Sequence, residues 1–277
     1  MMKAALEGTG AGRAPDDRGG TWARLRSSRW LLAMWTRRDY AVRYKQNALG
    51  LGWAVVQPLF LLLFYGLVFS RVLHVQSEKV PYVVTAFCGL TVWAFFAAAM
   101  SLGVPSLLGA TAILTKVWFP REVVPLASVC VSLIDLAVAN VLLILISLIF
   151  GNGLHPAMLA LPLVYFALAL VVAALVVMLS VLTVFARDIR QAIPLALQVL
   201  LIATPVMYTA DRVPRHVRTW YDLNPLAVAI SDVRAAVIDG RGPSAWPLVG
   251  MSAAGALLLW SALRYVCAVD GRMLDVL

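Results

Sequence analysis

Long apolar stretches separated by short polar segments dominate the pattern of residues along this chain. A helix of about 20 apolar residues is long enough to cross the roughly 30 Å hydrocarbon core of a bilayer. We therefore expect an all-α integral membrane protein with six transmembrane helices. The six predicted spans cover residues 51–72, 83–107, 123–150, 157–185, 193–210 and 247–268.

The residues before the first span divide into two parts. Residues 1–28 include the Gly-rich polar run EGTGAGRAPDDRGG, which predicts a disordered cytoplasmic N-terminus. Residues 29–46 combine Trp, Tyr and basic side chains with a rough apolar stripe that Arg38 interrupts. This mixture predicts an amphipathic helix in the cytoplasmic membrane interface, and a plain flank beside the first span is the alternative. The stripe consists of Leu31, Met34, Trp35 and Val42.

The segment between the last two spans has a helical pattern of its own. In WYDLNPLAVAISDVRAAVIDG, residues 220–240, apolar positions recur at helical spacing. Asn224 before Pro225 predicts a helix start, and Gly240 predicts its end. The pattern is too short and too polar to cross a membrane, so we expect short re-entrant helices that dip into the outer leaflet or cap the bundle. The stripe consists of Leu226, Ile230, Val233 and Val237.

Composition and charge support a membrane location and predict an orientation. Hydrophobic residues make up 62% of the 277 residues, more than a soluble domain of this size could bury, and mean hydropathy is +0.86. With six spans, 16 Lys and Arg lie on the side of the termini and seven on the other side. The positive-inside rule then places both termini in the cytoplasm. Nucleic-acid binding is the other interpretation of the basic N-terminus, but this region runs directly into a span.

The sequence contains little that predicts an active site. It has no G-x-x-x-x-G-K-[ST] motif, so we expect no ATP site and no other cofactor or metal in this chain. His74, His155 and His216 are far apart and lack the spacing of metal ligands. Asp135 is the acid deepest in a predicted span, and an intramembrane acid is a functional candidate because lipid makes its charge costly. A hydrogen bond to a neighbouring helix is its alternative role.

The segment LTKVWFPREVVP, residues 114–125, places charged and aromatic residues between two apolar stretches. Aromatic residues and Arg are common energetic anchors of protein interfaces, and prolines stiffen a turn so that docking loses less entropy. We interpret this segment as a surface for a partner protein, and a polar turn beside an interfacial aromatic belt is the alternative. The predicted contact residues are Lys116, Val117, Trp118, Phe119, Pro120, Arg121 and Glu122.

Three stretches in order resemble the permease subunits of polysaccharide exporters, within the type-2 ABC permease family. RRDYAVRYKQNALGLGWAVVQPLF (37–60) is similar to that family's first segment. KVWFPREVVPLA (116–127) is similar to its loop after span two, with Trp118 where Tyr is common, and ARDIRQAIPLALQ (186–198) resembles its R-D-I loop. The resemblance covers nearly the whole chain beyond about residue 28. Shorter matches are TPVMY (204–208) and LNPL (223–226).

This resemblance implies how the protein is organised. Residues 29–277 would form one transmembrane domain of a homodimer, surrounded by lipid in the cytoplasmic (inner) membrane of a bacterium. Two copies of a separate P-loop ATPase, which binds ATP and Mg, would dock on the cytoplasmic side. A coupling helix at about 112–123 would contact this ATPase, and outer gate helices at about 211–245 would cap the opposite side.

The resemblance also implies a cargo and a set of functional residues. The cargo would be a lipid-linked polysaccharide of the O-antigen or teichoic-acid type, and no nucleic acid would be bound. A drug or small-lipid exporter, a scaffold subunit and a membrane-bound glycolipid transferase are the alternatives. The interface helix would contribute Arg37, Arg38, Asp39, Arg43, Tyr44 and Lys45, and the second cytoplasmic loop Arg187, Asp188 and Arg190.

Aromatic residues in three of the spans are candidates for lining the path of such a polymer. Sugar rings have apolar C–H faces, so aromatic rings would give weak contacts that let a chain slide, whereas fixed charges would trap it. Ordinary packing or contact with lipid is the alternative role of these rings. The candidate residues are Tyr65, Phe69, Trp93, Phe95, Phe96 and Tyr208.

Overall fold

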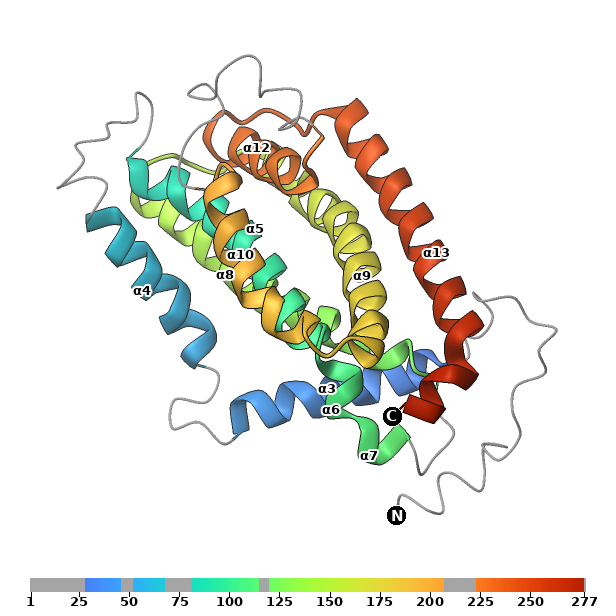
Figure 1. The fold of residues 1–277 in the computed structure, drawn as a ribbon. Coiled ribbons are helices and arrows are strands. Elements are labelled where there is room, and N and C mark those ends of the chain that lie inside the picture. The colour runs from blue at the N-terminus through green and yellow to red at the C-terminus, as the bar shows by residue number, and fades with distance from the viewer. Residues whose placement is uncertain (1–27, 46–51, 68–80, 115–119, 207–222, 277) are drawn as a thin grey trace.

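A computed structural model describes residues 28–45, 52–67, 81–114, 120–206 and 223–276 of the chain. Every regular element in these residues is a helix, which confirms the all-α prediction. Long helices run side by side between two ends, with α3 lying across one end and α12 across the other (Figure 1). The helices are α3 (Arg29–Lys45), α4 (Trp53–Leu67), α5 (Tyr82–Gly103), α6 (Ser106–Gly109), α7 (Thr111–Leu114), α8 (Val123–Ile149), η3 (Pro156–Ala160), α9 (Leu161–Phe185), α10 (Ile189–Ala203), α12 (Pro225–Ile238) and α13 (Ala245–Val276).

Four helical segments are long and apolar enough to cross a membrane, and they match four of the six predicted spans. They are Tyr82–Gly103, Val123–Ile149, Pro156–Phe185 and Ala245–Met273. The described parts of α4 and α10 have 15 residues each, about 22 Å of helix, so a count of six spans stays a prediction.

Prolines explain where two of the helices end. The sequence predicts a span to residue 107, but α5 ends at Gly103, since Pro105 has no backbone N–H to continue the helix hydrogen bonds, and the chain continues in the short helix α6. Similarly, α10 ends at Ala203, two residues before Pro205, whereas the predicted span continued to residue 210.

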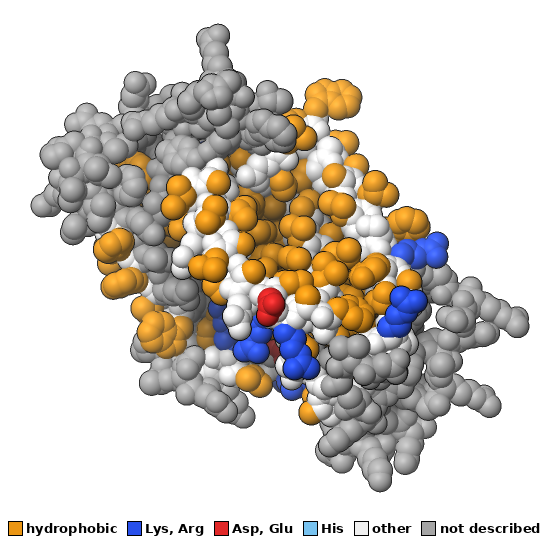
Figure 2. All heavy atoms as spheres, in the orientation of Figure 1, with side chains coloured by type: hydrophobic (Ala, Val, Ile, Leu, Met, Phe, Trp, Pro, Cys, Tyr) orange, Lys and Arg blue, Asp and Glu red, His pale blue; other side chains and the backbone are white. Residues whose placement is uncertain are grey.

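The interior of the bundle is centred on α5, which is buried on nearly all sides. It packs against α8, α12, α4 and α9, and its Phe87 and Phe95 are among the largest fully buried side chains. The most extensive packing between two helices in the described chain is that of α13 along α9. By contrast, α8 and α13 expose broad apolar faces that include Leu145 and Leu257. Such faces are costly in water and suit contact with lipid chains, and Figure 2 shows apolar side chains gathered over the side of the bundle that faces the viewer.

Helix α3 confirms the predicted helix at 29–46, but it presents a different face to the bundle. Leu31 and Trp35 pack inward, whereas Met34 and Val42, which the predicted stripe placed on the same face, are exposed. Inward-facing residues recur in adjacent pairs every four positions, and one of the exposed pairs between them is Arg37 and Arg38. Contact with α8 therefore selects the face of α3 that packs on the bundle, while Met34 and Val42 stay on its outer surface, where an interface helix would meet lipid.

Helix α12 closely follows the predicted pattern. Its four stripe residues are all buried, against α5, α9 and η3. The Asn224 side chain accepts a hydrogen bond from the Leu226 backbone N–H at 3.0 Å, which caps the helix as predicted. Gly240 just beyond its end has a φ of 65°, a conformation that favours glycine. Residues 211–222 of the predicted gate region lie outside the described residues.

Candidate functional site

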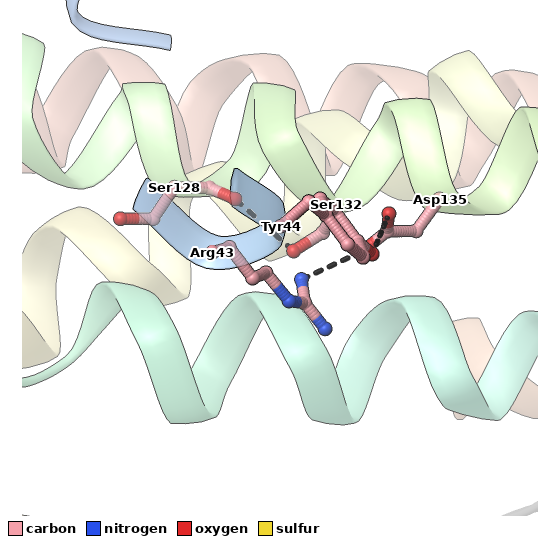
Figure 3. A network of polar contacts seen from close by, with 5 residues as sticks. All are labelled: Arg43, Tyr44, Ser128, Ser132 and Asp135. Atoms are coloured by element: carbon pink, nitrogen blue, oxygen red, sulfur yellow. Dashed lines mark hydrogen bonds and ion pairs between the residues drawn. The ribbon is translucent and has the colours of Figure 1, made fainter. Parts of the chain in front are cut away.

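A three-residue polar cluster joins α3 to α8 inside an otherwise apolar surround. Arg43 Nη1 donates to Asp135 Oδ2 at 2.6 Å, and the Tyr44 hydroxyl donates to Asp135 Oδ1 at 2.7 Å (Figure 3). Arg43 and Tyr44 belong to the last turn of α3, and Asp135 lies in the middle of α8. Both carboxylate oxygens are therefore satisfied, one of them by an opposite charge.

This cluster explains how an acid is accommodated in a predicted span. A carboxylate alone in lipid is costly, and the pairing with Arg43 compensates its charge. Burial, followed by the hydrogen bond to Asp135 and its charge, raises the pKa of the Tyr44 phenol well above its ordinary value. Tyr44 therefore stays protonated and remains a hydrogen-bond donor. The carboxylate thus holds the end of the interface helix against α8, a role different from the neutral interhelical bond considered above.

Other polar residues of α8 do not join this cluster. Ser132 Oγ donates to the Ser128 carbonyl oxygen at 3.0 Å, within the same helix (Figure 3). Asn140 accepts a hydrogen bond at 2.8 Å from the hydroxyl of Tyr165 on α9. The carboxylate of Asp135 therefore binds α3, whereas the amide of Asn140 binds α9.

A small cavity of about 80 Å³ lies beside the cluster, between α3, α4, α5 and α8. The cluster residues form its polar part, and Pro58 of α4 and Phe95 of α5 belong to its mostly apolar walls. It is far too small for a sugar polymer.

The predicted partner surface can be followed only at its two ends. Lys116, Val117, Trp118 and Phe119 lie outside the described residues. Pro120, Arg121 and Glu122 are buried at the start of α8, although the sequence interpretation placed them on an exposed surface. Arg121 Nη1 donates to the Asp270 carbonyl oxygen at 2.6 Å, and its Nε lies 3.1 Å from Asp270 Oδ1. Contact of these three side chains with a partner would therefore require them to become exposed.

The remaining predicted residues of α3 divide between its two faces. Arg37 and Arg38 are exposed, and the Arg38 guanidinium lies 4.4 Å from the centre of the Trp35 ring. Asp39 faces inward, where burial raises the pKa of its carboxyl group and the charge of Arg38 partly opposes this rise. The side chain of Lys45 lies outside the described residues.

The predicted second loop forms a charged edge of the bundle. Arg187 and Asp188 are exposed between α9 and α10, and Arg190 is exposed in the first turn of α10. Charged side chains gather at this end of the apolar face in Figure 2. These positions are accessible to a partner, and their role stays a prediction.

The described aromatic candidates for a polymer path belong to the packed interior. Trp93, Phe95 and Phe96 of α5 are all buried, and the ring centres of Trp93 and Phe96 are 5.7 Å apart. These three side chains could therefore line a polymer path only after α5 or its neighbouring helices rearrange. The side chains of the other candidates lie outside the described residues; these candidates are Tyr65, Phe69 and Tyr208.

Sequence reasoning missed charged residues that hold α12 in place. Arg234 donates to the carbonyl oxygens of Thr85, at 3.2 Å, and Val206, at 2.7 Å. Asp232 accepts a hydrogen bond at 3.0 Å from the backbone N–H of Ser244, just before α13. The sequence did contain a sign of this role. Asp232 and Arg234 flank Val233, a stripe position that was predicted to be buried, so both charged side chains had to lie close to the packed side of the helix.

Comparison with known proteins identifies the class. The family model for ABC-2 type transporters matches residues 31–238, which is 208 of the 277 residues. The chain belongs to this family, as the resemblance of its motifs predicts.

Individual relatives carry a more specific name. The chain is 28% identical over 213 residues to an O-antigen export system permease protein RfbA of Klebsiella pneumoniae, covering 76% of this chain and 81% of the relative. It is 27% identical over 236 residues to the protein of the same name from Myxococcus xanthus, covering 84% of this chain and 90% of the relative.

Proposed function

We propose that this chain is the permease subunit of an ABC exporter that moves a lipid-linked polysaccharide, of the O-antigen or teichoic-acid type, across the cytoplasmic membrane of a bacterium. The observation that carries the proposal is similarity along 76% to 84% of the chain to permeases named for O-antigen export. The matched region includes both the interface helix and the segment that precedes α8.

In the proposed assembly, two copies of this chain enclose the path and two copies of a separate ATPase bind ATP and Mg. The tightly packed interior supports a path between copies, because the cavity beside Asp135 is far too small for a sugar polymer. The placement of α3 and the end of α13 at the same end of the bundle supports a common cytoplasmic side for both (Figure 1).

The proposed mechanism starts with closure of the ATPase dimer on ATP. This closure moves the segment at 114–125, and α8 moves with it because the helix begins at Val123 without an intervening linker. Asp135 on α8 then carries the end of α3 along through its bonds to Arg43 and Tyr44. Exposed basic residues on α3 suit anionic lipid headgroups at the cytoplasmic surface.

The proposal is tested by expressing the chain with its cognate ATPase, followed by reconstitution into vesicles with a lipid-linked polymer. We expect ATP-dependent movement of the polymer that requires both subunits. Movement of small amphiphiles without polymer would indicate a drug or small-lipid exporter instead. Sugar transfer by the chain without the ATPase would indicate a glycolipid transferase, and either result would contradict the proposal.

A further inference from the structure

The segment that leads into α8 is anchored within the chain. Pro120, Arg121 and Glu122 are buried, and a turn links them to the helix, since Val123 N–H donates to the Pro120 carbonyl oxygen at 3.2 Å. Only 6% of the Arg121 side chain is exposed, so this guanidinium faces the interior of the chain. A residue buried in this way holds the segment in position and does not offer its charge to a docking protein.

The partner of Arg121 lies 149 residues further along, near the end of the last helix. One guanidinium makes two contacts with Asp270: one with the backbone carbonyl oxygen, at 2.6 Å, and one with the carboxylate, at 3.1 Å. Two contacts from a rigid planar group fix orientation as well as distance. The family match ends at residue 238, so Asp270 lies beyond the matched residues.

The helix that carries Asp270 is tightly joined to the rest of the bundle. Near its C-terminal end, Leu263, Val266 and Met273 of α13 are at most 2% exposed. Along its length α13 packs on α9 more extensively than any other pair of helices in the described chain. Because packed helices resist independent displacement, a force on Asp270 acts on α9 and α13 together.

We propose that Arg121 is a positioning residue that links the ATPase-contacting segment to the C-terminal helix through Asp270. A movement of the segment then displaces α8 directly and the α9–α13 pair through this link, so that both parts of the bundle respond together. The inference rests on the proposed function, since it requires an ATPase that moves the segment. Other residues then make the direct contact with the ATPase, and Arg121 transmits the movement of the segment to α13.

The test uses the complex of this chain with its ATPase, purified and reconstituted with lipid-linked polymer. Four forms are compared with the unmodified complex: Arg121→Gln, Asp270→Asn, the double variant, and the control Arg272→Gln. Arg272 is an exposed basic residue in the last turns of the same helix. The measurements are the ATPase content of the complex, the rate of ATP hydrolysis and the polymer exported per ATP hydrolysed.

We expect Arg121→Gln to lower the polymer exported per ATP by about tenfold while the ATPase remains bound, because charge-assisted bonds are lost. Asp270→Asn should have a smaller effect, because the bond to the backbone carbonyl oxygen persists. The double variant should be no worse than Arg121→Gln alone, as expected for residues that act through each other. Arg272→Gln should match the unmodified complex.

Other outcomes would overturn the inference. Loss of the ATPase from the Arg121→Gln complex alone would show that Arg121 docks the partner, and fully additive effects would show that the two residues act separately. If the Arg121→Gln chain itself does not fold, Asp270→Asn decides, because its partly exposed side chain can be changed without opening the interior. An unchanged export ratio in that variant would contradict the link. Failure of the proposed function is distinguishable, since the unmodified complex would then export no polymer.

Discussion

Replacing Asp135 with Asn is expected to loosen the interface helix from the bundle. The substitution keeps the shape of the side chain but removes the charge that binds Arg43 at 2.6 Å and Tyr44 at 2.7 Å. Hydrogen bonds to a charged group are roughly twice as strong as neutral ones, so part of each bond is lost rather than all of it.

The size of this effect can be worked out from the contacts. A hydrogen bond to a charged group contributes about 1.5–3 kcal/mol, and Asn retains about half of such a bond. The Arg43 side chain is 31% exposed and that of Asp135 is 19% exposed, so solvent screening lowers the value for the ion pair. We expect a net loss of about 1.5–2 kcal/mol, which increases the detached fraction of the α3 end roughly 10- to 30-fold.

The detached fraction can be measured with a spin label. The label is attached at Val42→Cys, which lies on the exposed face of α3, after the three native cysteines are replaced. Electron paramagnetic resonance should show a larger mobile component in Asp135→Asn. Asn140→Ala is the matched control, because Asn140 lies on the same helix but binds α9. Unchanged label mobility in Asp135→Asn, or an equal change in the control, would refute the reasoning.

Three further predictions concern packing, pH and topology. Gly89→Ala should lower the free energy of unfolding by about 1–3 kcal/mol, because a Cβ there would overlap the carbonyl oxygen of Val206 just beyond α10. Gly109→Ala is the control, since a Cβ at that position meets open space, and equal melting temperatures for the two variants would contradict this prediction. Asp39 has a pKa raised by burial, so its ionisation disfavours the folded state as pH rises through that pKa. Asp39→Asn should therefore be more stable than the unmodified chain at neutral pH, with the difference vanishing in acid, and a constant difference in a pH series of melting curves would contradict the assignment. In intact cells, a single Cys near Arg215 should react with an impermeant thiol reagent and one near Arg187 should not, and the reverse pattern would invert the topology.

Local pattern alone determined several elements of this protein. Four spans were predictable, because an apolar stretch long enough to cross a bilayer is a property of consecutive residues. The same holds for α12, whose cap at Asn224, buried stripe and stop near Gly240 all lie within one segment. The membership of the family likewise followed from short motifs that keep their order along the chain.

Only the tertiary structure decided which charged residues meet. Arg43 and Asp135 are 92 residues apart, and each had a separate interpretation until the packing of α3 on α8 brought them together. The local sequence led us to predict that Arg121 is exposed and contacts a partner protein. In the structure, packing of α13 alongside α9 places Asp270 within reach of Arg121, and Arg121 is buried. The physical reason is common to both cases: periodicity reports which face of a helix is apolar, whereas the partner of a buried charge depends on which distant helix packs against that face.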